Sequence, residues 1–600
     1  MTAICPAGYS VSVRIIGLLL LVSAAICAAA FRNIDLLWLE ALLFAAVLAA
    51  GFFTQKMRPP RWNCNAWLAF LIPAAASVVL RICLLPWIPI PHPVVPDEFS
   101  HILLAKTFLL GRLANPAHPL WQHFESIHIL SQPTYSSMYM PGQACFLALG
   151  QLLFGNLFWG VVLSTALFCG TLTWFLRAYL PPDWALFGGL LAAVRIGGAS
   201  YWNNSYWGGS AGALGGAMVL GAYPRLLKTW KPVPAVIFAA GLALLASTRP
   251  YEGAVLGGVL VVMLLWRARV FAPRRQVLQA CAISAVLLAI CGVALTREWK
   301  AVTGNAFTMP YQLNLKIYGW PTTLPWMRVR QITYRHPEFA LYQDFETAEH
   351  RQITVPAELP IGLLVHYSHW WQFLIGITLT PIFLFTGRIL KWRRPRDIWI
   401  AGAVVALAVI TEQSAYPHYW SPITAVSFLF IVQGLRYLAQ TRFGSSIVRF
   451  AIPVSGALII AHAATLSRGG PPPQTPNFIS WCCTEVRIKD REPVAQQLEA
   501  IPGEHLVFVS YNLKNYDTFE WVYNEPDIDR ARVVWARDMG PQKNAELIRY
   551  YPNRHVWQVR VSKGQPATLT ALRRESPADS RRESDHAGVT PPLPPRRALR

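Results

Sequence analysis

Charged residues are scarce in this chain. Asp, Glu, Lys and Arg make up 14% of its 600 residues, whereas soluble domains carry about 25%. Hydrophobic residues make up 54%, and the mean hydropathy is +0.33. Several apolar runs approach the roughly 20 residues that a helix needs to cross a bilayer. The composition therefore excludes a soluble protein and predicts a polytopic α-helical membrane protein whose first partner is the lipid bilayer.

Acidic residues are the scarcer of the two charged classes, with 31 against 53 basic residues, which leaves a net charge of +22. Much of the excess lies in short loops between apolar runs, a pattern that marks the cytoplasmic side of a membrane protein. Nucleic-acid binding would need one concentrated basic face with interleaved aromatic residues, and the sequence has none. The basic loops contain Lys56, Arg58, Arg61, Arg225, Lys228, Lys231, Arg267, Arg269, Arg274, Arg275, Arg388, Lys391, Arg393, Arg394 and Arg396.

Cysteine is also sparse, with ten residues that lie mostly inside apolar runs, where they act as small hydrophobic side chains. Cys482 and Cys483 are neighbours, and neighbouring cysteines rarely bridge, so no disulfide is expected. No Cys-x-x-Cys or Cys/His zinc spacing occurs, and His123 and His128 are five residues apart rather than the four that place two ligands on one helical face. We therefore expect no metal site, and nothing in the sequence specifies a divalent cation or an oligomeric state.

The apolar runs predict about thirteen membrane-spanning helices. With the N-terminus in the cytoplasm, every basic loop falls on the cytoplasmic side, and the first run is a retained span because no small-residue cleavage site ends it. The C-terminus then lies outside the cytoplasm. The runs cover residues 13–31, 36–54, 66–90, 157–178, 184–199, 208–223, 233–247, 251–266, 277–296, 362–386, 398–412, 418–438 and 447–466.

This topology divides the chain into seven parts. Loops longer than about 15 residues usually carry function, so the two long outside loops are the places to search for a site. The parts are N-terminal transmembrane helices at 1–90, a first outside loop with interfacial helices at 91–156, a transmembrane bundle at 157–296, a second outside loop at 297–361, C-terminal transmembrane helices at 362–466, an outside α/β domain at 467–565 with strands at 505–511, 531–538 and 555–561 and a helix at 541–551, and a disordered tail at 566–600.

Two adjacent carboxylates open the first outside loop, in "VVPDEFSHILLAKTF" at residues 94–108. Ionisable groups at membrane depth are costly and are functional candidates for that reason. Pro96 predicts a helix that starts here, so Asp97 could also be a helix cap stabilised by the helix dipole. The residues alone leave both interpretations of Asp97 and Glu98 open.

Three stretches in order resemble the GT-C superfamily of membrane glycosyltransferases, which includes protein O-mannosyltransferases and aminoarabinose transferases. "PDEFSHILLAKTFLLGRL" is similar to their Asp-Glu pair followed by an aromatic residue and a histidine. "SMYMPGQACFLALGQLLFG" at 137–155 and "EQSAYPHYWSPITAVSFLF" at 412–430 resemble two later elements. The similarity covers roughly residues 91–436 as an architecture. The C-terminal domain and "YWNNSYWGGSAGALGG" at 201–216 depart from those families and indicate a separate, less characterised bacterial branch.

The resemblance implies that a sugar moves from a polyprenyl-phosphate-linked donor to an envelope lipid, glycan or protein. Such a transfer needs a carboxylate base for the acceptor hydroxyl and groups that hold the departing phosphate. The expected enzyme is an inverting hexosyl or pentosyl transferase of the bacterial cytoplasmic (inner) membrane. The implied catalytic residues are Asp97 as base and Glu98 orienting it or the acceptor; Arg249, His418, Tyr419, His101 and Glu412 would bind donor phosphate or sugar, and Glu125, Gln132 and Tyr139 would bind acceptor or sugar.

Most of these residues have a structural alternative. Arg249 could pair with Glu252 or reach the lipid headgroups, and His418 and Tyr419 could belong to an aromatic belt at the membrane surface. Two other protein classes also compete with the enzyme. A transporter of envelope precursors would need charges inside several spans and paired halves, whereas the ionisable residues here gather at the outer edge and no internal repeat is visible. An anchor for the C-terminal domain would not need thirteen spans.

Overall fold

The computed structural model describes residues 34–50, 64–271, 273–320, 324–414, 416–467, 479–483, 491–515, 520–563 and 565–572. The predicted span at 13–31 lies outside these described residues. The chain forms two compact units. The first contains Met1–Trp121, Glu125–Ile488 and Thr518–Glu520, and the second contains Gln122–Phe124, Lys489–Asp517 and Trp521–Arg600.

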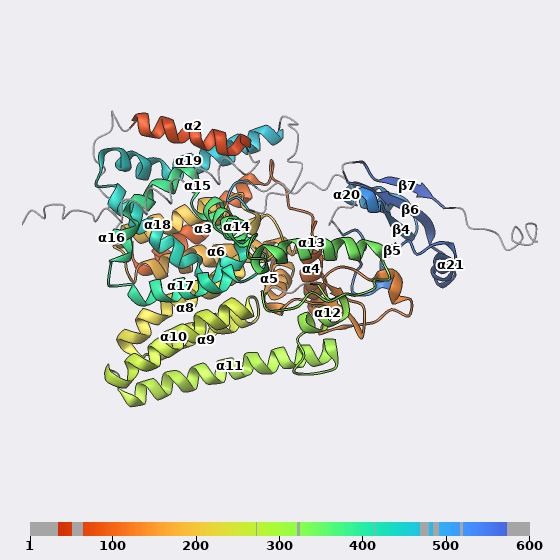
Figure 1. Cartoon of the computed structure of the whole chain (residues 1–600), viewed down its shortest axis with the longest axis horizontal. Helices are drawn as coiled ribbons and strands as arrows, with labels where there is room; N and C mark the ends of the chain where they lie inside the picture. Colours follow the sequence, from red (N-terminus) through yellow and green to blue (C-terminus); the bar gives the residue numbers. More distant parts are fainter. Residues whose placement is uncertain are drawn as a thin grey trace, which may run out of the picture. The chain divides into compact units, whose positions relative to one another are not determined.

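The first unit is a helical bundle with one small sheet (Figure 1). Its helices are α2 (Ile34–Ala50), α3 (Ala66–Leu84), α4 (Pro96–Leu109), α5 (Pro141–Phe154), α6 (Phe158–Leu176), α7 (Pro182–Arg195), α8 (Gly209–Thr229), α9 (Pro232–Ala246), α10 (Pro250–Phe271), α11 (Arg274–Thr303), α12 (Pro310–Tyr318), α13 (Pro337–Thr354), α14 (Leu359–Leu374), α15 (Gly376–Leu379), α16 (Thr386–Leu390), α17 (Arg396–Ile410), α18 (Thr424–Leu438) and α19 (Arg442–Ser467). Three 3-10 helices join them: η2 (Tyr201–Asn203), η3 (Thr380–Phe385) and η4 (Pro417–Ile423). A fourth, η1 (Trp121–Phe124), is divided between the units, because Gln122–Phe124 belong to the second.

The described helices confirm a multi-span protein but not the predicted number of spans. Six are long and apolar enough to cross a membrane, and a seventh is possible if the bent pair Leu359–Leu374 and Gly376–Leu390 counts as one span. Several predicted spans form shorter helices, among them α7 with 14 residues and α9 with 15. Helix α8 has 21 residues, but it is rich in glycine, and 15 of the 21 are buried.

The two predicted outside loops are folded. The first contains α4, α5 and a three-stranded antiparallel sheet in the order β1 (Asn115–Pro116), β3 (Thr134–Ser137), β2 (Ile129–Leu130). The second contains α12 and α13, and Ile127 of the first loop packs with Tyr318, Trp320, Phe339 and Tyr342 of the second. Helix α4 was expected to lie in the interface with one face in water, whereas the structure buries ten of its 14 residues. Helix α5 and strand β3 of the same loop pack against α4 and contribute to this burial.

The second unit is a small α/β fold whose strands match the sequence prediction closely. Its sheet has the order β5 (Val533–Arg537), β4 (His505–Tyr511), β6 (His555–Val561), β7 (Thr568–Ala571). Strand β4 is parallel to β5 and β6, and β7 is antiparallel to β6. Helices α20 (Arg491–Ala500) and α21 (Pro541–Tyr550), with η5 (Leu513–Asn515) and η6 (Ile528–Arg530), complete it.

Two sequence predictions need correction here. Strand β7 lies inside the predicted disordered tail at 566–600, because its backbone pairs with β6 from Thr568 to Ala571; residues 573–600 lie outside the described part. Cys482 and Cys483 form a disulfide that the sequence analysis did not expect. The peptide between them is cis, and their Cα atoms lie 3.0 Å apart.

Candidate active site

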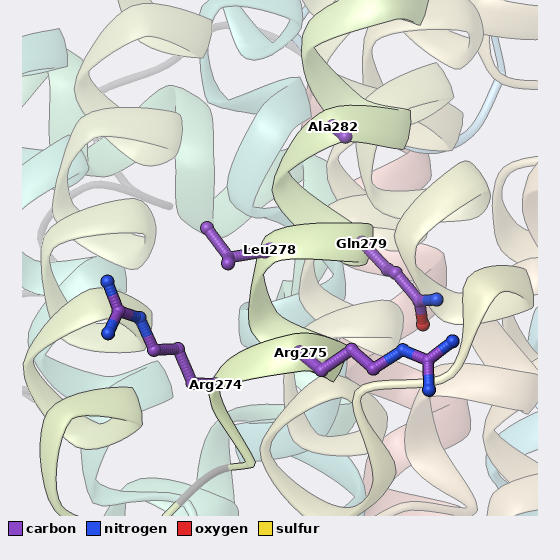
Figure 2. A pocket seen from close by; sticks show the side chains of 5 residues that line it. All are labelled: Arg274, Arg275, Leu278, Gln279 and Ala282. Carbon is purple, nitrogen blue, oxygen red and sulfur yellow. The ribbon is translucent and has the colours of Figure 1, made fainter.

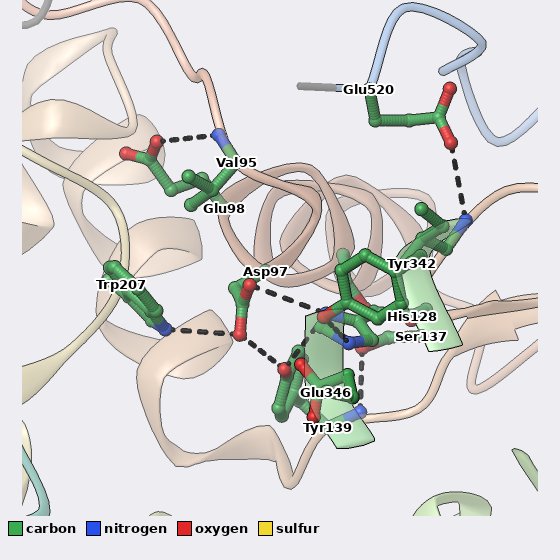
Figure 3. Close-up of polar contacts among 12 residues, drawn as sticks. Val95, Asp97, Glu98, His128, Ser137, Tyr139, Trp207, Tyr342, Glu346 and Glu520 are labelled. Atoms are coloured by element: carbon green, nitrogen blue, oxygen red, sulfur yellow. Dashed lines mark hydrogen bonds and ion pairs between the residues drawn. The ribbon is translucent and has the colours of Figure 1, made fainter. Parts of the chain in front are cut away.

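The acidic pair lies in the first turn of α4. Pro96 is the first helical residue, where its missing N–H costs no hydrogen bond. The two carboxylates then point in different directions (Figure 3). Glu98 is fully buried and accepts hydrogen bonds from the backbone amides of Val94 (2.8 Å), Val95 (3.3 Å) and Tyr206 (2.8 Å). Glu98 therefore ties the start of α4 to the segment before α8.

Asp97 points toward a group of polar side chains from three other segments. Its Oδ1 accepts hydrogen bonds from the hydroxyl of Tyr139 and, at 3.1 Å, from the indole N–H of Trp207. Its Oδ2 lies 3.3 Å from Nδ1 of His128. The Asp97 side chain is still 13% exposed, so a small polar group can reach it. A helix cap alone would not need these three side-chain partners.

These partners set the charge of Asp97. Burial alone would raise the pKa of Asp97, but the nearby His128 and the hydrogen bonds from His128 and Tyr139 outweigh it and lower the pKa well below its ordinary value. Asp97 is therefore ionised at neutral pH and can accept a proton. Its hydrogen-bonded partners also fix its orientation.

Residues of both outside loops hold His128 in place. Its Nδ1 lies 3.2 Å from the Tyr139 hydroxyl, and its Nε2 lies 3.0 Å from the Tyr342 hydroxyl on α13. The backbone of His128 has a φ of 62°, which is uncommon for a residue with a side chain. The Ser100 hydroxyl and the Met138 amide both donate to its carbonyl. His128 is thus a positioned partner of Asp97.

A half-buried carboxylate of α13 lies close to this histidine. Glu346, shown in Figure 3, accepts a hydrogen bond from Gln413, which follows α17, and its charge interacts with that of His128. Burial raises the pKa of Glu346, whereas His128 lowers it and Asp97 raises it further. Two negative charges near one histidine repel each other, so Glu346 favours its protonated form while Asp97 stays ionised.

A cation lies at the other side of the site. The guanidinium of Arg249, just before α10, lies 4.7 Å from the ring centre of Tyr419, and it has no hydrogen bond or ion pair with another described residue. Glu252 interacts electrostatically with Arg249, but the two side chains form no close ion pair among the described contacts. Arg249 is partly exposed, so its N–H donors are available to a ligand. An arginine with open donors suits a phosphate group.

Two histidines lie near both Asp97 and Arg249. His101 stacks on the ring of Tyr139 with centroids 4.6 Å apart, and His418 packs against Trp207 at 4.6 Å and Tyr419 at 4.7 Å. Each histidine lies within electrostatic range of both Asp97 and Arg249. Burial lowers the pKa of His101 to about 3, an effect that Arg249 adds to and Asp97 opposes. His101 is therefore neutral and can donate or accept one hydrogen bond.

Glycines of α8 allow η4, which carries His418, to pack close to this helix. A Cβ atom on Gly216 would lie 2.0 Å from the carbonyl oxygen of Pro422, and a Cβ on Gly212 would lie 2.4 Å from Oγ of Ser421. The segment "YWNNSYWGGSAGALGG" thus supplies both Trp207, which binds Asp97, and the small residues that position His418. Its role in the site explains a stretch that the family resemblance left without a function.

We expect Gly216→Ala to destabilise the protein and to lower activity, because the new methyl group meets backbone that cannot move out of its way. Overpacking of this kind costs roughly 1–3 kcal/mol. Gly258→Ala on α10 is the matched control, since a Cβ there meets nothing within 4 Å. The measurement is the thermal midpoint of both variants in detergent. Equal midpoints for the two variants would contradict the close approach of α8 and η4.

Glu98 has an environment that predicts a pH effect on stability. Burial raises its pKa from 4.5 to about 7, although three backbone hydrogen bonds lower it and Asp97 raises it. Between pH 4.5 and about 7, the folded protein therefore keeps a proton on Glu98 that the unfolded chain has lost. This contribution to stability is complete below the unfolded pKa and is lost as the pH rises through about 7.

For Glu98→Gln we accordingly expect a flatter dependence of the thermal midpoint on pH between about 4.5 and 7 than for wild type. The rise of the Glu98 pKa on folding corresponds to roughly 3 kcal/mol in the free energy of unfolding. Glu358→Gln is the control, because Glu358 lies outside the site and pairs with Arg351. Parallel curves for Glu98→Gln and wild type would show that Glu98 does not titrate in this range.

The remaining predicted residues occupy different surroundings. Glu125 lies 2.5 Å from Arg335 and 3.0 Å from His336, so it links the first outside loop to the second. Burial would raise its pKa, but the hydrogen bonds from His336 and Arg335 lower it overall. Gln132 is partly exposed and makes none of the described contacts with Asp97. Glu412 is buried, and its Oε1 has no hydrogen-bond partner among the described residues. Its charge interacts with that of Arg249, so Glu412 lies near the cation of the site.

The structure thus brings Asp97, Tyr139, His101, His418, Tyr419 and Arg249 into one site. The sequence analysis did not include His128, Trp207, Tyr342 and Glu346 among the site residues. His128 was noted only as a possible metal ligand with His123, and Trp207 lies in the stretch at 201–216 that departs from the related families. Nothing local marked Tyr342 and Glu346. Among the described residues, no group of three or more His, Cys, Asp or Glu side chains could hold a metal ion.

No protein-family model matches the chain, and no curated protein matches it either. Several solved structures match the chain. ArnT from Cupriavidus metallidurans, solved in the apo state and bound to undecaprenyl phosphate, is 15% identical, with a TM-score of 0.45 over 83% of this chain and 93% of that chain. An archaeal oligosaccharyltransferase, AglB from Archaeoglobus fulgidus, in complex with an inhibitory peptide and a dolichol-phosphate, is 13% identical, with a TM-score of 0.42 over 82% of this chain and 69% of that chain.

Identities of 13–15% and TM-scores of 0.42–0.45 are low. The likeness is one of fold only, and the function below is inferred from the site.

Proposed function

We propose that this protein is an integral membrane glycosyltransferase that moves a hexosyl or pentosyl residue from a polyprenyl-phosphate-linked donor to an envelope acceptor, with inversion, on the outer face of the bacterial cytoplasmic membrane. One observation carries the proposal. An ionised, partly exposed Asp97 lies in the same site as Arg249, a cation with open hydrogen-bond donors, at one end of a membrane-spanning bundle.

Asp97 would act as the base. The acceptor hydroxyl gives its proton to the carboxylate while its oxygen forms a bond to the anomeric carbon of the sugar. The bond from that carbon to the phosphate oxygen breaks on the opposite face, and the electron pair leaves with the polyprenyl phosphate. A single displacement of this kind inverts the anomeric configuration. Tyr139, Trp207 and His128 hold the carboxylate in one orientation for this step.

Arg249 would hold the departing phosphate. The phosphate of a lipid-linked donor is already a good leaving group, so it needs charge stabilisation rather than a strong acid. Arg249 lies at the start of α10, where a headgroup can reach it while the lipid tail stays in the bilayer. His101 and His418, which lie near both charged residues, suit the sugar hydroxyls as neutral hydrogen-bonding groups.

The test is the glycan profile of a strain that lacks this protein, compared by mass spectrometry with the same strain carrying the wild-type gene. Envelope glycolipids, polysaccharides and glycoproteins are measured together. We expect one of them to lose a single sugar in the deletion strain and to regain it with the gene, which would also identify the acceptor. Accumulation of a complete precursor, with no sugar missing from any class, would instead support the transporter alternative.

A further inference from the structure

A second polar pocket lies at the opposite end of the bundle from Asp97. Helix α8 starts two residues after Trp207, which binds Asp97, and its 21 residues extend about 30 Å. Its last turns line a cavity of about 410 Å³ together with residues from the end of α6, from α10 and from the start of α17. The neighbouring helix α17 runs the other way, from this cavity to Gln413 near the active site.

The lining of this cavity is strongly basic. Its charged residues are Arg177, Arg225, Lys228, Arg267, Arg394 and Asp397, so five cations surround one carboxylate. Asp397 is already engaged, because Arg267 lies 2.8 Å from it and Tyr223 donates a hydrogen bond of 2.6 Å. The other cations have no carboxylate of the cavity left to neutralise them.

Contacts to the backbone hold two of these cations in position. The guanidinium of Arg225 stacks on Trp174 at 3.8 Å and donates to the carbonyls of Gly221 and Trp174. Arg394 donates to the carbonyl of Ala178 at 2.8 Å. Each guanidinium has five N–H donors, and these contacts leave several for a ligand. Lys228 is exposed and has no hydrogen bond or ion pair with a described residue.

This arrangement differs from a basic loop that only sets membrane orientation. Cations that serve as a topology signal can point separately into water, whereas here four segments direct them into one cavity beside the buried rings of Tyr179 and Tyr223. Five positive charges around one negative charge fit an anion with several oxygen atoms. A phosphate group has this chemistry.

The surface next to the cavity indicates the source of the phosphate. On α10, in the two turns that lead to Arg267, Val262 is 66% exposed and Trp266 is 70% exposed. Exposed apolar side chains on a spanning helix face acyl chains, and tryptophan is enriched at the level of the headgroups. A phospholipid can therefore place its headgroup in the cavity and its chains along α10, which free phosphate cannot do.

We propose that this cavity binds the headgroup of an anionic phospholipid of the membrane leaflet opposite the active site. The phosphodiester lies among Arg225, Lys228 and Arg394, and the acyl chains lie against α10. Basic pockets between membrane helices are suited to such headgroups. The site is independent of the chemistry at Asp97, and it would bind lipid whether or not the protein transfers sugars.

The test compares two double variants of the full-length protein in nanodiscs of zwitterionic lipid, titrated with phosphatidylglycerol and followed by native mass spectrometry. Lys228→Gln with Arg394→Gln removes two cations of the cavity. Arg274→Gln with Arg275→Gln is the matched control, because these arginines line a different, open pocket at the start of α11 (Figure 2). Lys228→Glu alone is a further variant in which no backbone hydrogen bond is lost.

We expect the cavity variant to bind phosphatidylglycerol roughly 30-fold more weakly than wild type, Lys228→Glu to be weakened as well, and the α11 variant to match wild type. Inorganic phosphate should not displace the lipid. If both double variants lost affinity for phosphatidylglycerol equally, the effect would be one of general charge attraction, and the proposal would be overturned. Unchanged binding in all variants, or displacement of the lipid by inorganic phosphate, would overturn it too.

Discussion

Asp97→Asn is expected to lower the rate of sugar transfer by about 10²–10⁴-fold, the usual contribution of a general base. Asparagine keeps the size of the side chain and can still accept the hydrogen bonds from Tyr139 and Trp207. It cannot take a proton from the acceptor. The effect should therefore be on kcat, with little change in the KM for the donor. The measurement is the initial rate of transfer by purified protein in nanodiscs.

The control for this variant comes from the chain itself. Asp183 follows Pro182 at the start of α7 just as Asp97 follows Pro96 at the start of α4. Loss of a favourable charge near the helix N-terminus should therefore lower the free energy of unfolding about equally in Asp183→Asn and Asp97→Asn. The rate of sugar transfer by Asp183→Asn should stay at the wild-type value. If both variants retained full activity, Asp97 would be a helix cap and the carboxylate of another residue would have to act as base.

Arg249→Ala is expected to raise the KM for the lipid-linked donor by roughly 10–150-fold. This range corresponds to the loss of hydrogen bonds to a charged group, about 1.5–3 kcal/mol. The guanidinium has no hydrogen bond or ion pair with the described residues, but its charge interacts with the buried carboxylates of Glu252 and Glu412. The thermal midpoint of the variant is therefore measured together with the KM. Arg249→Lys should recover only part of the affinity, because an ammonium group cannot bind two phosphate oxygens as a fork.

Arg297→Ala is the control for Arg249. Arg297 is an exposed cation near the end of α11, and Thr134 of the first outside loop donates a hydrogen bond to the nearby Val302 carbonyl. Arg297 therefore lies on the side of the bundle that carries the first outside loop, but outside the described site. Donor KM values that rise equally in both variants would indicate attraction of the donor by surface charge rather than a phosphate site at Arg249.

Local patterns in the sequence were enough to predict the class of fold. Apolar runs identified the helical bundle, and short stretches typical of strands at 505–511 and 555–561 identified β4 and β6. The number of spans could not be read this way. Hydropathy does not separate a span from a buried helix such as α8, whose glycines pack against η4 inside the protein.

The candidate site was predictable where a residue carried its own signal. A carboxylate pair after a proline, an arginine in a short turn and a histidine beside a tyrosine all stood out. His128 and Tyr342 did not, because they act through contacts between residues 214 positions apart. The different roles of Asp97 and Glu98 were equally invisible, since they depend on which carboxylate meets the backbone amide of Tyr206.

The most direct test of the central claim is a transfer reaction with three purified components: this protein in nanodiscs, the acceptor isolated from the deletion strain, and a polyprenyl-phosphate-linked sugar. The wild-type protein should release free polyprenyl phosphate and form glycosylated acceptor in equal amounts, with the anomeric configuration inverted, and Asp97→Asn should form neither. If the wild-type gene restores the glycan in cells but the purified protein forms no product from these components, the protein does not catalyse the transfer and the proposed function is wrong.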